Sequence, residues 1–258
     1  AGKFDEAKAL RWIANAFGKI PTPKRKLPDL WTVEPTNDGE RQFTVRRKGE
    51  VQFVTVAYRL PSSLHPDTLA ADFAVDILGD TPNVRLHKAL VETGKAAQVF
   101  GFTRFTRDPG FVVFGAVVKK GESLEPVAQT LIEVIEGSLR KQPPTEDEIK
   151  RTRQQNATGF ERILANPQSF GVGLSEFVAL GDWRLFFYSR DRATRISSAE
   201  VDAAAARYFV RDNRVVGFFV PEDTPQRAEI PAAPAVTALL ADYRPSAQGQ
   251  TAEAFEPT

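Results

Sequence analysis

The chain has 258 residues, with 34 Lys and Arg against 33 Asp and Glu, so its formal net charge is +1. This balance argues against nucleic acid or an anionic membrane as a partner, because both usually select a clear basic excess. Hydrophobic residues make up 42% and charged residues 26% of the chain, which is typical of a globular protein. There is no cysteine, which excludes disulfides, thiolate metal sites and cysteine nucleophiles.

The chain begins with Ala1 and contains no methionine. Because a translated reading frame begins with Met, we expect a fragment or a processed product of a longer protein. No stretch approaches the roughly 18 apolar residues that a membrane helix needs, so we expect no membrane insertion.

The N-terminal region predicts a helix, a connector and then two strands. Residues 4–19 place apolar side chains at three- and four-residue spacing, with Asp5 as the cap. Residues 21–39 contain four prolines and show neither a helical nor a strand period. Strands are expected from 43 to 48 and from 51 to 58, paired as a hairpin across the turn between them.

Helices and strands then follow in blocks. Further helices are predicted at 66–80, 83–93, 123–140, 145–165, 167–181, 183–195, 198–209 and 236–243. Further strands are predicted at 96–106, 111–119 and 214–220. Thr145-x-x-Glu148 and Ser197-x-x-Glu200 are capping-box patterns. This order predicts an α+β fold, with a mostly antiparallel sheet of five or six strands and helices packed on one face.

His65 and His87 are the only histidines, and they lie 22 residues apart. A zinc site on a helix needs two ligands one turn apart, and neither histidine has a second within one turn. We therefore interpret both as surface residues that bind no metal.

Other groups have plain structural explanations. Gly171-Val172-Gly173 lacks the third glycine and the preceding strand of a dinucleotide-binding loop, so it is expected to allow close helix packing. Asp72 and Asp76 are one helical turn apart and are expected on a solvated face. The aromatic cluster of Trp183 and residues 186–188 is expected in the core. The residues alone reveal no catalytic set.

Three stretches nevertheless resemble a known family. They are residues 9–21, residues 77–94 (ILGDTPNVRLHKALVETG), and the group 180–187, 218–222 and 227–231. The chain resembles the pitrilysin/insulinase family of zinc peptidases, the inverzincins, and in particular a non-catalytic C-terminal-type half-domain of the long tandem bacterial members. The resemblance implies the LuxS/mitochondrial-processing-peptidase-like metallohydrolase fold.

The family's functional residues do not carry over. The resemblance implies repeated α+β half-domains around a peptide chamber, one of which binds zinc through His-x-x-Glu-His and a distal Glu. Another holds the substrate through an Arg and a Tyr. This sequence has no His-x-x-Glu-His, and the Arg and Tyr positions are Val91 and Ala97. We expect no catalytic, cofactor-binding or metal site in this chain, and zinc in a missing half-domain of the parent protein.

The resemblance also predicts the organisation of the chain. Residues 1–20 would be the terminal helix of a missing preceding half-domain, 21–39 a connector, 40–222 the inactive peptidase-like half-domain, and 223–258 a Pro/Ala-rich tail and linker. The expected partner is the catalytic half-domain of the same polypeptide, with extended peptides as further partners. Family analogy alone favours a periplasmic or otherwise exported protein.

Two other functions stay open at this point. The chain could come from a pseudo-peptidase that serves as a structural scaffold and acts only through protein–protein contacts. It could also be an autonomous enzyme that uses its carboxylates, which would require activity from the isolated chain. Substrate preference and oligomeric state are not readable from the sequence.

Overall fold

The computed structural model describes residues 2–26, 28, 35–79 and 84–244. The chain divides into two compact units, Ala1–Thr224 and Pro225–Thr258. In the described part of the second unit, the helix predicted at 236–243 is the short α8 (Val236–Leu239). Among the residues described in both units, no helix is long and apolar enough to cross a membrane.

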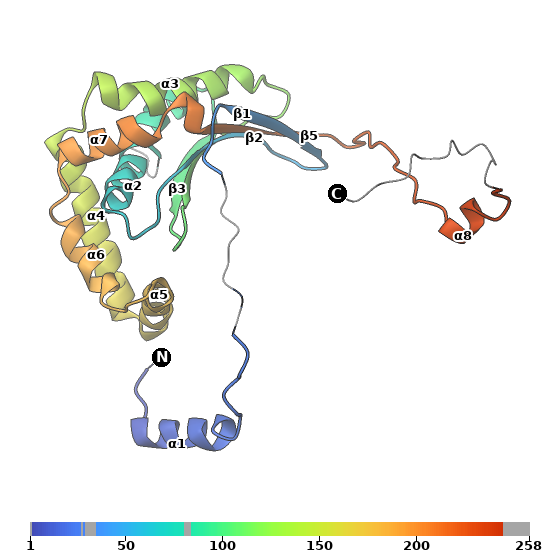
Figure 1. Ribbon diagram of the computed structural model, residues 1–258. Coiled ribbons are helices and arrows are strands. Elements are labelled where there is room, and N and C mark those ends of the chain that lie inside the picture. Colours follow the sequence, from blue (N-terminus) through green and yellow to red (C-terminus); the bar gives the residue numbers. More distant parts are fainter. Residues whose placement is uncertain (1, 27, 29–34, 80–83, 245–258) are drawn as a thin grey trace, which may run out of the picture. The chain divides into compact units, whose positions relative to one another are not determined.

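A five-stranded sheet with the order β1-β5-β2-β4-β3 forms the centre of the first unit (Figure 1). Its strands are β1 (Arg41–Arg47), β2 (Gln52–Arg59), β3 (Gln98–Arg104), β4 (Phe111–Val118) and β5 (Arg214–Pro221). β1 and β5 are parallel, and the other neighbouring pairs are antiparallel. The predicted mostly antiparallel sheet is confirmed.

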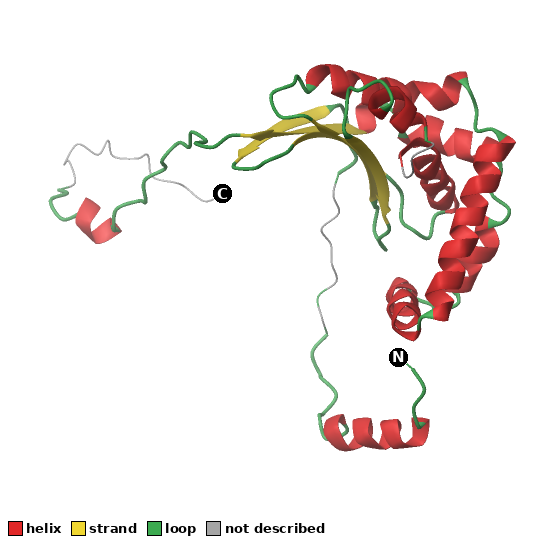
Figure 2. Cartoon of the chain, turned by 180° about the vertical axis from the view of Figure 1, so that it is seen from behind, coloured by secondary structure: helices red, strands yellow, loops and turns green. Residues whose placement is uncertain are grey.

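The helices of this unit follow the predicted blocks. They are α1 (Glu6–Phe17), α2 (Pro66–Gly79), the π-helix η1 (His87–Val91), α3 (Glu125–Lys141), α4 (Glu146–Ala165), α5 (Pro167–Leu180), α6 (Leu185–Ala193), α7 (Ser198–Tyr208) and the 3-10 helix η2 (Arg211–Asn213). Both predicted capping boxes are present, at Thr145 on α4 and at Ser197 on α7. Figures 1 and 2 show α2, α3 and α7 gathered on one side of the sheet.

The core lies between the sheet and these helices. Along β2, buried and half-buried residues alternate, and Val54, Val56 and Tyr58 are buried. They belong to one cluster with Phe73 of α2 and Leu131 of α3. Because successive side chains of a strand point to opposite faces, this alternation places the core on one face only. The α+β class with helices on one face is confirmed.

The predicted hairpin between the first two strands is wrong. β1 and β2 are joined by a short loop at residues 48–51, but β5 lies between them and pairs with both. β5 is a nearly continuous apolar run, and the central position gives its backbone groups partners on both sides. A local turn signal carries no information about a strand more than 150 residues later.

The helix predicted at 83–93 is a different type of helix from the α-helix that was expected. It is a π-helical turn, in which the Glu92 N–H donates to the His87 carbonyl at 3.1 Å. Leu86 and Leu90 are buried at the four-residue spacing that led to the prediction. A four-residue spacing of apolar side chains does not distinguish a π-helix from an α-helix. Residues 80–83, which include the start of the prediction and the predicted end of α2, lie outside the described residues.

The aromatic cluster is only partly in the core. Phe186 is buried against Phe160 at a centroid distance of 4.7 Å, and it holds α4 and α6 together. Trp183 and Tyr188 are 53% and 61% exposed, so their predicted burial is wrong. Consecutive helical residues point about 100° apart, and a run of aromatic residues cannot share one face.

Candidate functional site

The two histidines lie on different elements. His65 precedes α2, and its Nδ1 accepts a hydrogen bond from the Asp67 backbone N–H at 3.2 Å. His87 opens η1, and its Nδ1 lies 3.7 Å from a carboxylate oxygen of Glu92. Across the described ranges, no group of three or more His, Asp or Glu residues could hold a metal ion. The described part of this chain therefore does not fit the zinc centre of the peptidase family.

Val91 and Ala97 flank the turn between η1 and β3. Val91 ends η1 and is half-buried, while Ala97 is exposed. The Ala97 backbone N–H donates to the Val117 carbonyl at 2.8 Å, which starts the pairing of β3 with β4. Their side chains are aliphatic and provide no hydrogen bond. Their correspondence to the family's Arg and Tyr positions stays a prediction.

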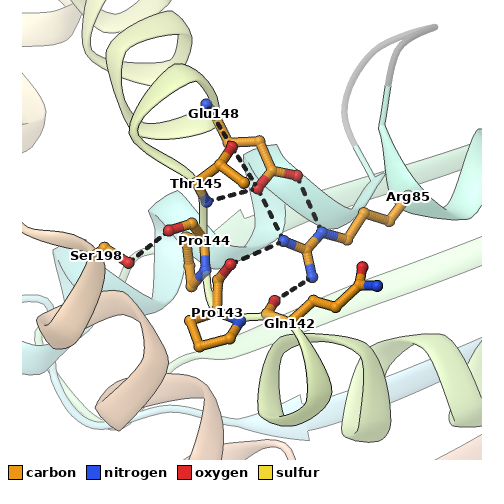
Figure 3. Close-up of polar contacts among 7 residues, drawn as sticks. All are labelled: Arg85, Gln142, Pro143, Pro144, Thr145, Glu148 and Ser198. Carbon is orange, nitrogen blue, oxygen red and sulfur yellow. Dashed lines mark hydrogen bonds and ion pairs between the residues drawn. The ribbon is translucent and has the colours of Figure 1, made fainter.

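A polar cluster is built around Arg85, just before η1 (Figure 3). Its guanidinium makes a two-pronged ion pair with Glu148 of α4, with Nε–Oε1 at 3.0 Å and Nη2–Oε2 at 2.8 Å. Arg85 Nη1 also donates to the Gln142 carbonyl at 2.7 Å, at the end of α3. Ser198 of α7 donates to the neighbouring Pro144 carbonyl at 2.6 Å. The cluster fixes the α3–α4 turn against η1 and α7.

Glu148 has two roles in this cluster. Besides holding Arg85, it closes the capping box of α4 by accepting the Thr145 backbone N–H at 2.9 Å. Burial would raise the pKa of Glu148, but the hydrogen bonds from Arg85 and from the Thr145 backbone outweigh burial and lower the pKa. Glu148 therefore stays ionised and saturated with donors, which suits a structural anchor and not a general base.

The capping box revealed Glu148 from the sequence, whereas Arg85 was missed. Arg85 lies 63 residues before Glu148, and a single basic residue on a short helix gives no local signal.

The sequence analysis also misplaced two acidic residues. Asp72 and Asp76 of α2 are half-buried, not solvated, and Asn156 of α4 donates to Asp76 at 3.3 Å. The packing of α4 on α2 covers the face that the sequence pattern left open.

A second polar network is built around Arg214. Arg214 of β5 contacts Glu40 at 2.5 Å and Glu136 of α3 at 2.6 Å. The Tyr58 hydroxyl donates to the same Glu136 carboxylate at 2.9 Å. Burial, followed by the charge of Glu136, raises the pKa of Tyr58 far above its usual range. The phenol stays protonated, and the carboxylate of Glu136 accepts hydrogen bonds from both Tyr58 and Arg214, so the network joins α3, β2 and β5.

A surface depression of about 400 Å³ runs along α4. Its lining residues are Gln154, Gln155, Thr158, Gly159 and Arg162. They come from a single helix and include one charged group, so they form neither an acid–base pair nor an activated nucleophile. Gly171 and Gly173 lie within α5 and form no phosphate-binding loop. The described residues thus provide structural polar networks and no catalytic arrangement.

Comparison with known proteins shows the family of the chain. The family profile of the peptidase M16 inactive domain matches residues 1–156. The crystal structure of an inactive peptidase domain from Bordetella parapertussis is 41% identical, with a TM-score of 0.65, over 72% of this chain and 99% of that chain.

Longer chains from Helicobacter pylori are also similar. Zinc protease PqqE is 26% identical over 165 residues, and the match covers 63% of this chain but 35% of that protein. A protease crystal structure shares the fold, with a TM-score of 0.78 at 19% identity, and the match covers 85% of this chain and 53% of that one. The chain therefore spans only part of these relatives, and it belongs to the peptidase M16 inactive-domain family.

Proposed function

We propose that this chain is the non-catalytic half-domain of a zinc metallopeptidase, and that it supports a catalytic half-domain of the same polypeptide in peptide hydrolysis. Membership of the inactive-domain family carries the proposal. The sequence adds that no His-x-x-Glu-His occurs in the chain. The partial coverage of the Helicobacter pylori relatives is what a half-domain would give.

Its contribution would be to form part of the chamber wall and to orient the substrate. Among the described strands, β1 and β3 are the outer strands of the sheet and each leaves one edge without a strand partner. An extended peptide can add to such an edge through main-chain hydrogen bonds, which are independent of peptide sequence. This mode suits a role in holding peptides without cleaving them.

The coding sequence upstream of Ala1 tests the proposal. A preceding half-domain with His-x-x-Glu-His and a later Glu would make this chain the supporting half of a zinc peptidase, because two His and a carboxylate form a catalytic zinc site. A preceding half-domain with those ligands replaced would contradict the proposal. The chain would then belong to a pseudo-peptidase scaffold that acts only through protein–protein contacts.

A further inference from the structure

The helices α4, α5 and α6 extend beyond the main core. The core cluster contains Ile149 from the start of α4 and Ala193 from the end of α6, and no residue from 150 to 192, all of which the structure describes, belongs to it. The main packing partners of α5 are α4 and α6. Figures 1 and 2 both show α5 at the end of α4 that is farthest from α3. This part of the chain is therefore stabilised mainly by contacts of its own.

Aromatic rings provide those contacts, and residues 160–190, which contain them, form what we term the aromatic lobe. The rings are those of Phe160 on α4, Phe170 and Phe177 on α5, Trp183 just before α6, and Phe186 and Phe187 on α6. Within residues 160–190, Phe186 alone is buried. Its ring centroid lies 4.7, 5.8 and 5.6 Å from those of Phe160, Phe170 and Phe177. Because so little apolar surface is buried in the lobe, its opening should cost much less free energy than unfolding of the main core.

Two side chains tie α4 to the rest of the domain shortly before Gly159. Arg153 Nη2 donates to the Ile196 carbonyl at 2.6 Å, beyond the end of α6. Asn156 Nδ2 donates to a carboxylate oxygen of Asp76 on α2 at 3.3 Å. The residue after Gly159 already belongs to the lobe. Gly159 therefore lies where the contacts of α4 change from the main domain to the lobe.

Gly159 is also the weakest point of α4 as a helix. A Cβ atom at this position would meet nothing within 4 Å, so packing does not require a glycine. Glycine lowers the stability of a helix interior relative to alanine, because it loses more backbone freedom when the helix forms. The helix is thus easiest to interrupt at the boundary between the two sets of contacts.

A similar boundary lies on α6. The Arg190 guanidinium lies over the rings of Phe160 and Phe187, 5.0 and 5.4 Å from their centroids, and so belongs to the lobe. Two residues later, Arg192 forms an ion pair with Glu200 of α7. The lobe is therefore connected to the main domain through short boundary segments at both of its ends.

We infer that the aromatic lobe opens independently of the main core, and that α4 divides at Gly159 when it does. The inference does not depend on the proposed function. In the open state the first part of α4 stays packed on α2, while α5 and the end of α4 lose their packing. The lobe surface carries Trp183 and Tyr188, which are 53% and 61% exposed. A partner that binds these side chains in only one state of the lobe would shift the equilibrium between the two states.

Hydrogen exchange of the full chain at several low urea concentrations tests the inference. Amides of residues 161–165 and of α5 should exchange at least about tenfold faster than those of residues 150–157 and of β2. Their exchange should also depend less on urea, because opening of the lobe exposes less surface than global unfolding. Equal rates and equal urea dependence on the two sides of Gly159 would overturn the inference.

Two glycine substitutions separate opening of the lobe from global unfolding. Gly137→Ala on α3 also adds a Cβ atom in free space, but within the main domain. It should slow exchange in β2 about two- to fivefold and leave the lobe amides unchanged, because α3 stays folded when the lobe opens. Gly159→Ala should slow the lobe amides about two- to fivefold, because it stabilises the closed state.

The two variants also define the results that would contradict the inference. If Gly137→Ala slowed the lobe amides as much as those of β2, the lobe would open only with the whole domain. If Gly159→Ala left exchange in the lobe unchanged, α4 would not divide at this residue.

Discussion

The Arg85–Glu148 pair joins two segments that are 63 residues apart in the sequence. Both side chains are largely buried, and removal of one partner leaves the other charge without its main contact. We expect Arg85→Met to lower the free energy of unfolding by about 2–3 kcal/mol. Urea unfolding measures the change.

Arg46→Met serves as the matched control for this prediction. Arg46 pairs with Glu222 at 3.9 Å, and its side chain is 59% exposed. Exposed ion pairs contribute less than about 1 kcal/mol, so this variant should unfold almost like the parent chain. Equal losses in the two variants would show that Arg85 acts only as a surface charge.

At Glu200, we expect the free energy of unfolding to fall as the solution becomes acidic. Hydrogen bonds from the Ser197 backbone and hydroxyl, helped by Arg192, lower the pKa of Glu200 from 4.5 to about 2. Because the pKa is lower in the folded state, the stabilisation is complete above about pH 4.5 and disappears as the pH falls toward 2. Glu200→Gln should flatten the unfolding free energy in that window. An unchanged pH dependence would exclude Glu200 as a contributor.

At the scale of elements, Gly115 should tolerate no side chain, because the ring of Phe100 occupies that space. We expect Gly115→Ala to destabilise the chain by about 1–3 kcal/mol through overpacking. Phe100→Leu in the same background should restore part of the loss. Denaturant unfolding of the single and double variants measures both effects.

Gly137 in α3 provides a control of opposite sign. An added Cβ atom at Gly137 would meet nothing within 4 Å. Gly137→Ala should therefore stabilise the chain by about 0.5–1 kcal/mol, because alanine is the better helix former. Stabilisation by Gly115→Ala would contradict the placement of the Phe100 ring.

Elements whose signals are local could be predicted from the sequence. The capping boxes at Thr145 and Ser197 marked the starts of α4 and α7, and the strand predicted at 51–58 corresponds to β2. The strand order could not be predicted, because β5 inserts between β1 and β2 from far along the chain. Pairing between distant strands depends on tertiary packing, which periodicity does not encode.

The same distinction applies to the polar networks. Glu148 was recognisable as a capping residue, whereas its ion pair with Arg85 was not. The ion pairs of Arg214 with Glu40 and Glu136 likewise join residues that are far apart in the sequence, so no local pattern predicts them. The family resemblance, which rests on specific stretches of sequence, indicated the inactive half-domain more directly than composition or periodicity did.

At the scale of the whole molecule, the chain should bind little zinc. Its two histidines lie on separate elements, and the described acidic residues form no cluster suited to a metal. We expect well below one zinc per chain by elemental analysis after dialysis against a weak chelator. One tightly held zinc per chain would refute our interpretation of His65 and His87.

Peptide hydrolysis tests the division of labour between half-domains most directly. A flexible peptide is incubated with zinc and with this chain, with the separately produced preceding half-domain, or with both. We predict no cleavage by this chain alone, weak or no cleavage by the preceding half-domain alone, and clear cleavage by the mixture. Cleavage by this chain alone, or full activity of the preceding half-domain without it, would contradict a supporting, non-catalytic role.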